Sequence, residues 1–196
     1  MGEELFRGAL KNLSTTDLKD FDFDHEELQA LGNWTYIGMF LHEAERSLLL
    51  SKDLNDNGTF TEMDQSILSH GMFRNAILSY CKCYSSTANG KVSLDSKAIF
   101  AGQNEMKAIH HTMMDIRNSF IAHNGLNEID IAIIAVNESA KELELAKTYT
   151  LSTPLSDFDN FLRVIAFVQA WVVGNFNRKV DKIQLRFGKV ITFKQT

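Results

Sequence analysis

The chain contains few residues that break or cross-link a fold. It has one proline, Pro154, and two cysteines in 196 residues. So few breakers, combined with long stretches of apolar residues at helical spacing, predict a mainly helical protein. Cys81 and Cys83 flank a single residue, which is too close for an ordinary disulfide, and the chain lacks the further cysteines of a zinc site. We therefore expect reduced thiols in an intracellular protein.

The sequence also lacks membrane and secretion signals and an excess of basic charge. No segment reaches the roughly 18 apolar residues of a membrane span, and residues 1–7 show neither region of a signal peptide. A formal net charge of -5 and a pI near 5.7 exclude a protein that coats nucleic acid generally. We expect a cytoplasmic protein that makes no membrane contact and touches nucleic acid only locally.

Apolar periodicity predicts an up-and-down bundle of four to five helices, forming a single domain over residues 1–196. Trp34 and Trp171 fall on apolar stripes and are expected in the core. The expected helices span residues 24–52, 61–85, about 94–123 with an interruption at 101–103, and a last helix capped by Ser156. Asp24 with Glu27, and Thr61 with Asp64, resemble N-terminal caps of the first two helices.

The pattern changes between the last two of these helices. Ile129, Ile131 and Ile133 alternate with Asp130 and Ala132, and residues 147–152 alternate again. This pattern predicts a short antiparallel β-hairpin. Residues 139–146 contain strong helix formers, so a helical turn there is an alternative.

Arg117 and His123 carry the clearest chemical signal. Asn124 and Gly125 suit the residues that end a helix, so His123 is expected in the last turn, where the helix dipole favours the imidazolium. On a regular helix the two side chains lie about 9 Å apart along the axis and roughly 120° apart around it. A single copy would surround one phosphate poorly. Two copies related by a two-fold axis would form a shared cleft, which predicts a homodimer.

The string Arg117-Asn118-Ser119-Phe120-Ile121-Ala122-His123 resembles the signature of the HEPN superfamily. These small all-helical proteins carry an Arg, often followed by Asn, Asp or His, and then a His after four to six intervening residues; here five intervene. The order of helices around the motif is also similar, particularly to abortive-infection-like and uncharacterised members whose motif ends in Ala-His. The resemblance covers about residues 25–185 in architecture, but only the seven-residue motif is specific.

The resemblance implies an endoribonuclease that needs no metal and no other cofactor. His123 would move a proton to or from the RNA, Arg117 would stabilise the phosphorane, and Asn118 would position one of them. RNA would be cut to a 2',3'-cyclic phosphate, and DNA would resist cleavage because it lacks the attacking hydroxyl. The family also suggests a toxin-antitoxin or phage-defence setting, with an antitoxin as partner.

Alternatives to this interpretation stay open. Some members of the superfamily are inactive, so the chain can instead be a catalytically silent helical homodimer that binds a protein or ligand, for example as the partner of a nucleotidyltransferase. Arg117 can also be an ordinary surface charge paired with Asp115 or Glu105, and His123 can merely close a helix end.

Three further residues are candidates for substrate binding. His110 lies seven residues before Arg117 on the same helix face, so it can extend an RNA cleft or be a partly buried histidine, and we favour the second. Lys82 and Arg74 are candidates for phosphate contacts, with solvated surface charge as the alternative.

Residues 53–64 imitate a calcium-binding EF-hand loop, with oxygen-bearing side chains at positions one, three and five and a glycine at position six. Two departures weaken this interpretation. Position twelve is Asp64 rather than Glu, and the chain has one such loop where these loops usually pair. The alternative is a polar turn followed by the Thr61 cap.

Overall fold

The structure is a computed structural model that describes residues 26–57, 61–85, 93–118, 130–138, 142–151 and 153–192. In these residues the chain forms five α-helices and, before the last helix, one antiparallel β-hairpin, so the predicted fold class is confirmed. The elements are α2 (Glu26–Asn57), α3 (Glu62–Lys82), α4 (Ser96–Ile99), α5 (Asn104–Ile116), β1 (Asp130–Glu138), β2 (Leu143–Leu151), a 3₁₀ turn (Leu155–Asp157) and α6 (Phe158–Phe187). None of the helices described is both long and apolar enough to cross a membrane.

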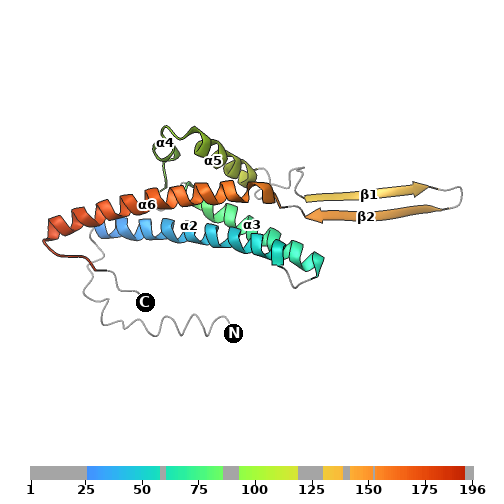
Figure 1. Ribbon diagram of the computed structural model, residues 1–196, viewed down its shortest axis with the longest axis horizontal. Helices are drawn as coiled ribbons and strands as arrows, with labels where there is room; N and C mark the ends of the chain where they lie inside the picture. Colours follow the sequence, from blue (N-terminus) through green and yellow to red (C-terminus); the bar gives the residue numbers. More distant parts are fainter. Residues whose placement is uncertain are drawn as a thin grey trace, which may run out of the picture.

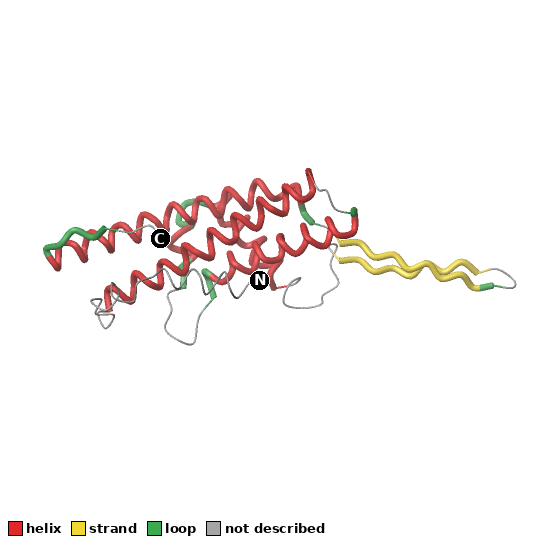
Figure 2. Tube along the Cα trace, turned by 90° about the horizontal axis from the view of Figure 1, so that it is seen from below, coloured by secondary structure: helices red, strands yellow, loops and turns green. Residues whose placement is uncertain are grey.

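The long helices α2, α3 and α6 lie side by side and form the body of the molecule (Figure 1). Helices α3 and α6 both run opposite to α2, and α5 packs across α3 and α6. The β1–β2 hairpin, called the arm below, projects beyond the end of the helices in both views (Figures 1 and 2). The chain therefore combines a helical bundle with a protruding β-ribbon.

Aromatic and branched side chains fill the space between α2, α3 and α6. Phe73 of α3 is fully buried and stacks on Phe158 and Phe161 of α6, with ring centroids 5.7 and 6.5 Å apart. Trp34 and Trp171 meet with centroids 5.9 Å apart, and Trp34 is 8% exposed. The prediction that both tryptophans belong to the core is therefore confirmed for Trp34, while Trp171 packs against the core partly buried.

The buried face of α2 differs from the one that its largest apolar residues suggest. Tyr36, Met39 and Leu50 fit a helical period, yet they are exposed. The core side chains of this helix are Trp34, Ile37, Leu41, Ala44 and Leu48. The buried face continues into Ser47 and Ser51, whose small side chains let α3 approach closely.

Polar contacts join α2 to α3 along this seam. The Ser51 hydroxyl donates to the carbonyl oxygen of Ser69 at 2.8 Å. The Asn75 side chain donates to the Ser47 hydroxyl at 2.9 Å and to the Glu43 carboxylate at 3.2 Å. Because buried polar groups are stabilised only when they are hydrogen-bonded, these pairs fix how the two helices align.

The helix boundaries depend on individual residues. Thr61 caps α3 as predicted, since its hydroxyl accepts from the Asp64 N–H. Asp24, half of the other predicted cap, lies outside the described residues. The expected cap at Ser156 is wrong: Ser156 sits in the 3₁₀ turn, and α6 begins at Phe158. The predicted interruption at 101–103 is confirmed, because Gly102 turns the chain with a φ of 73°.

The arm is a regular ladder from Asp130 paired with Leu151 to Glu138 paired with Leu143. The helical alternative for residues 139–146 is wrong, because Leu143 to Ala146 lie in β2. Pairing with β1 gives these residues backbone partners that outweigh their helix propensity. Ile129 lies outside the described residues.

Candidate functional site

Arg117 and Asn118 lie just beyond the last regular turn of α5. The Arg117 N–H still bonds to the carbonyl oxygens of Met113 and Met114, and Arg117 and Asn118 are themselves π-helical. The regular α-helix is described as far as Ile116, and residues 119–123 of the predicted helix lie outside the described residues. The 9 Å and 120° relation between Arg117 and His123 therefore stays a prediction.

The Arg117 guanidinium is half-buried and held by its neighbour. Its Nη1 donates to the Asn118 side-chain oxygen at 3.0 Å. A guanidinium has five N–H donors, and this bond uses one of them. Asn118 itself is exposed, so the pair stands at the surface of the helix end.

Arg117 also faces α3, where its positive charge acts on Cys81. Burial raises the pKa of the Cys81 thiol to about 12, and the Arg117 charge opposes this rise in part. Cys81 contacts α5 directly, with its Sγ 3.8 Å from the Met113 carbonyl oxygen. The guanidinium is thus close to the α3–α5 contact.

The antiparallel run of α3 and α5 extends this contact toward Arg74. Tyr84 meets His110, and Cys81 meets Met113, so the two helices run in opposite directions and the turn after Met113 is level with the turn before Cys81. Arg74 lies seven residues before Cys81, on the same face of α3, and is half-buried. Two helices therefore bring basic residues to the same end of the bundle.

His110 belongs to the core. It is 3% exposed, its Nδ1 lies 2.9 Å from the Tyr80 hydroxyl, and its ring packs on Tyr84 and Phe100 with centroids 4.5 and 4.9 Å away. Burial, together with the neighbouring His111, lowers the pKa of His110 to about 4. This is the buried histidine that the sequence favours, and its ring is packed among aromatic side chains.

Lys82 points elsewhere. It is exposed, and its Nζ lies 5.1 Å from the centre of the Phe40 ring on α2. Cys81, one residue earlier, faces α5 instead. The structure therefore does not bring Lys82 together with Arg117.

His123, together with Asn124 and Gly125, lies outside the described residues. The structure thus gives the position of Arg117, Asn118 and Arg74 but not that of the proposed proton-transfer group. Among the residues that are described, no cluster of three His, Cys, Asp or Glu side chains is arranged to hold a metal ion.

The calcium interpretation of residues 53–64 fails on local structure. Asp53 to Asn57 form the last turns of α2, which runs five residues past its predicted end. Asn55 donates to the Ser51 carbonyl oxygen and to the Ser69 hydroxyl. Side chains at alternate positions of a helix diverge, whereas an EF-hand needs them to converge from a loop.

Sequence reasoning missed a basic segment at the end of α6. Residues 178–189 hold five basic residues and one acidic residue, a local net charge of +4 in a chain of net charge -5. A concave surface there is lined by Asn175, Arg178, Lys179 and Lys182. None of those three basic residues forms an ion pair with a carboxylate among the described residues. A count of charge by window would have found this segment.

This basic segment is remote from Arg117. Arg178 lies 20 residues along α6 from Phe158, which corresponds to about 30 Å, and the end of α5 lies near the start of α6 (Figure 1). The two surfaces are therefore not one site.

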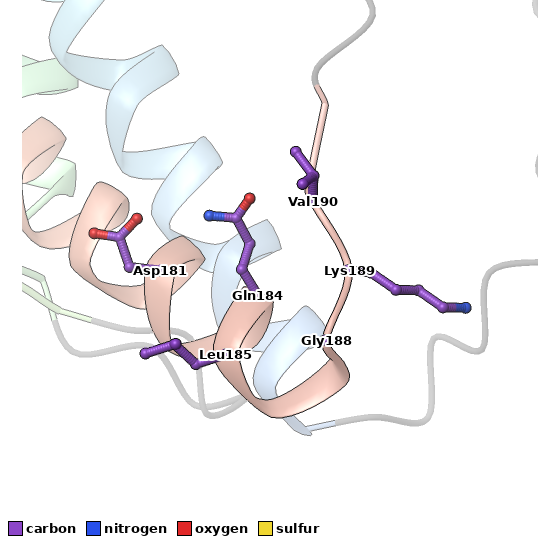
Figure 3. Close-up of a pocket in the computed structure, with 6 residues that line it drawn as sticks. All are labelled: Asp181, Gln184, Leu185, Gly188, Lys189 and Val190. Carbon is purple, nitrogen blue, oxygen red and sulfur yellow. The ribbon is translucent and has the colours of Figure 1, made fainter.

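The α6 helix then ends in a turn that forms its own hollow. Gly188 has a φ of 64°, and the Ile191 N–H donates to the Gln184 side-chain oxygen at 2.8 Å. Figure 3 shows Gln184 directed toward the returning chain, whereas Lys189 points away from it. The Gln184 contact thus closes the turn, and the Lys189 side chain is exposed.

Comparison of the chain with protein-family models, curated proteins and solved structures found no match. The resemblance to the HEPN superfamily therefore stays a prediction based on the seven-residue motif.

Proposed function

We propose that the chain is a HEPN-like, metal-independent endoribonuclease in which Arg117 and His123 act on one RNA phosphate, in a cytoplasmic toxin or phage-defence setting. The observation that carries the proposal is the Arg117–Asn118 hydrogen bond at the end of α5. It supports the role that the motif implies for Asn118, because a guanidinium held by its neighbour needs less ordering when it meets a phosphate.

In the proposed reaction, the ribose 2'-hydroxyl attacks the adjacent phosphorus and the 5'-oxygen leaves, which forms a 2',3'-cyclic phosphate. His123 accepts the proton of the attacking hydroxyl or supplies one to the leaving oxygen. Arg117 donates hydrogen bonds to the phosphorane oxygens as their negative charge develops. Arg74 adds positive charge from α3, and the basic segment of α6 contacts phosphates farther along the RNA.

A homodimer with a shared cleft is one arrangement of this site. It would add the Arg117 and His123 of a second copy. Mixing the Arg117→Ala and His123→Ala proteins tests it, because a shared cleft regains one intact Arg and one intact His. Restored cleavage supports the shared cleft, and its absence leaves the reaction to the residues of one chain.

The reaction itself is tested with purified protein and total cellular RNA in EDTA. We expect cleavage products that end in a 2',3'-cyclic phosphate, and a loss of at least about 100-fold for Arg117→Ala and for His123→Ala. Arg46→Ala, an exposed arginine on α2, is the matched control and should keep full activity. An inactive wild type, or an Arg117→Ala protein as active as wild type, overturns the proposal.

The alternative function, a catalytically silent homodimer that binds a protein or a ligand, is favoured by a different observation. The arm exposes large apolar side chains that no helix covers, a surface typical of protein contacts. This alternative predicts that Arg117→Ala changes stability or association but abolishes no reaction.

A further inference from the structure

One face of the arm is apolar and open to solvent. Ile134, Val136, Leu143 and Leu145 are 62%, 59%, 57% and 55% exposed. The strand register places them on the same face, because Val136 pairs with Leu145, Ile134 with Lys147, and Glu138 with Leu143. We call these six side chains the arm face.

Over the outer part of the arm, from Ala135 to Asn137, the opposite face is small and polar. Ala135 pairs with Ala146, and Asn137 pairs with Glu144, whose carboxylate accepts from the Asn137 amide at 3.5 Å. This outer part of the arm is therefore amphipathic, like a strand pair that lies on a core. Beyond its base, where β2 reaches α3, none of the described helices covers it (Figures 1 and 2). A two-stranded ribbon of this kind is at best marginally stable alone in water.

The arm face is complementary to itself. From base to tip its levels are Ile134 with Lys147, then Val136 with Leu145, and then Glu138 with Leu143. A two-fold rotation about the middle level brings the apolar residues together. The same rotation sets Glu138 of one copy at the level of Lys147 of the other, and it does so twice.

We propose that the arm face packs on the arm face of a second copy of the chain, with the two arms antiparallel and Val136 and Leu145 at the two-fold axis. The isologous contact explains why one charge of each sign flanks an apolar centre. A nucleic acid is a poor occupant, because the two strands carry three acidic residues and one basic residue.

This contact is independent of the proposed ribonuclease activity. Antiparallel arms put the two bundles at opposite ends, so each Arg117 stays in its own bundle and the two do not share a cleft. The arm contact and the shared cleft are therefore competing arrangements of a homodimer, and failure of the arm contact leaves the reaction untouched.

Light scattering after size exclusion, supported by sedimentation equilibrium, tests the proposal with the full chain. We expect a wild-type dimer at about 100 µM and a monomer for Leu145→Lys. Glu138→Lys and Lys147→Glu alone should each weaken dimerisation about tenfold, because the two-fold axis repeats every lost charge pair. The double variant, Glu138→Lys with Lys147→Glu, should return to within a few-fold of the wild type.

Asn137→Lys on the polar face is the matched control and should leave the dimer intact, and circular dichroism checks that each protein is folded. Should Leu145→Lys fail to fold, the two charge variants and their combination still decide the question. A monomeric wild type overturns the proposal. So does a dimer that is insensitive to Leu145→Lys, or a double variant no better than its parents.

Discussion

The helical bundle and the arm differ in what surrounds their apolar side chains. Phe73 is fully buried between α3 and α6, whereas Val136, also on a regular element, is 59% exposed. Both belong to amphipathic elements, but only the bundle supplies a second apolar layer within the same chain. Intrachain packing therefore stabilises the bundle, whereas the exposed apolar side of the arm gains little from the described helices.

The largest expected effect is the removal of a central aromatic ring from the bundle. Phe73→Ala should lower the free energy of unfolding by about 3–5 kcal/mol, because it leaves a cavity between two stacked rings. Urea denaturation followed by circular dichroism measures this loss. Leu78→Ala, on the same helix but 37% exposed, is the control and should cost much less. Equal losses for the two variants would contradict the assignment of the core.

Acid should weaken the bundle through His110. Its pKa is about 4 when folded and 6.5 as the ordinary value, so the unfolded chain binds a proton first as the pH falls. The loss of folding stability caused by His110 fades above pH 6.5, and it should reach about 2 kcal/mol at pH 5. Denaturation at pH 7 and pH 5 measures it.

The matched comparison for this pH effect uses the adjacent histidines. His110→Gln should flatten the stability profile between pH 6.5 and pH 5, whereas His111→Gln should keep most of the wild-type slope, because burial is the larger cause of the low His110 pKa. A profile unchanged by His110→Gln would show that other groups cause the acid sensitivity.

A smaller effect is expected at the polar seam of the bundle. Ser51→Ala removes the hydroxyl that donates to the Ser69 carbonyl oxygen, and it should cost about 1 kcal/mol. Ser66→Ala, whose hydroxyl bonds only within its own helix turn, is the control. Thermal unfolding of both variants separates an interhelical bond from a local one, and a larger loss for Ser66→Ala would contradict this account.

The smallest effect is expected on the arm. Val136→Thr, measured at a concentration where light scattering gives a monomer, should change the stability of the bundle by less than about 0.5 kcal/mol. A loss above 1 kcal/mol would mean that the arm packs on its own helices, which would break the contrast between the two regions.

Much of the fold follows from local sequence patterns. The apolar stripe of α6 buries Phe158, Phe161 and Ile165 as its period predicts, and the Thr61 cap fixes the start of α3. Which face of α2 is buried could not be predicted, since Tyr36 and Met39 follow a helical period just as its core residues do. Only the arrangement of α3 and α6 around α2 decides between the two stripes.

The candidate site was predictable in part. The motif located Arg117 and Asn118, which the structure brings into contact. The position of Arg74 at the same end of the bundle as Arg117 depends on how α5 packs against α3, and so does the burial of His110. The sequence pattern of either helix alone does not specify this packing. The basic end of α6 was visible in the charge pattern, although its concave surface was not.

The two native thiols have a practical consequence. Cys81 and Cys83 are about 1% exposed, and burial raises the pKa of each to about 12. Maleimide and iodoacetamide reagents require an accessible thiolate, so both residues should stay unlabelled while the bundle is folded. A cysteine introduced on the arm would then be the selective attachment point for a fluorophore or spin label without removal of the native pair.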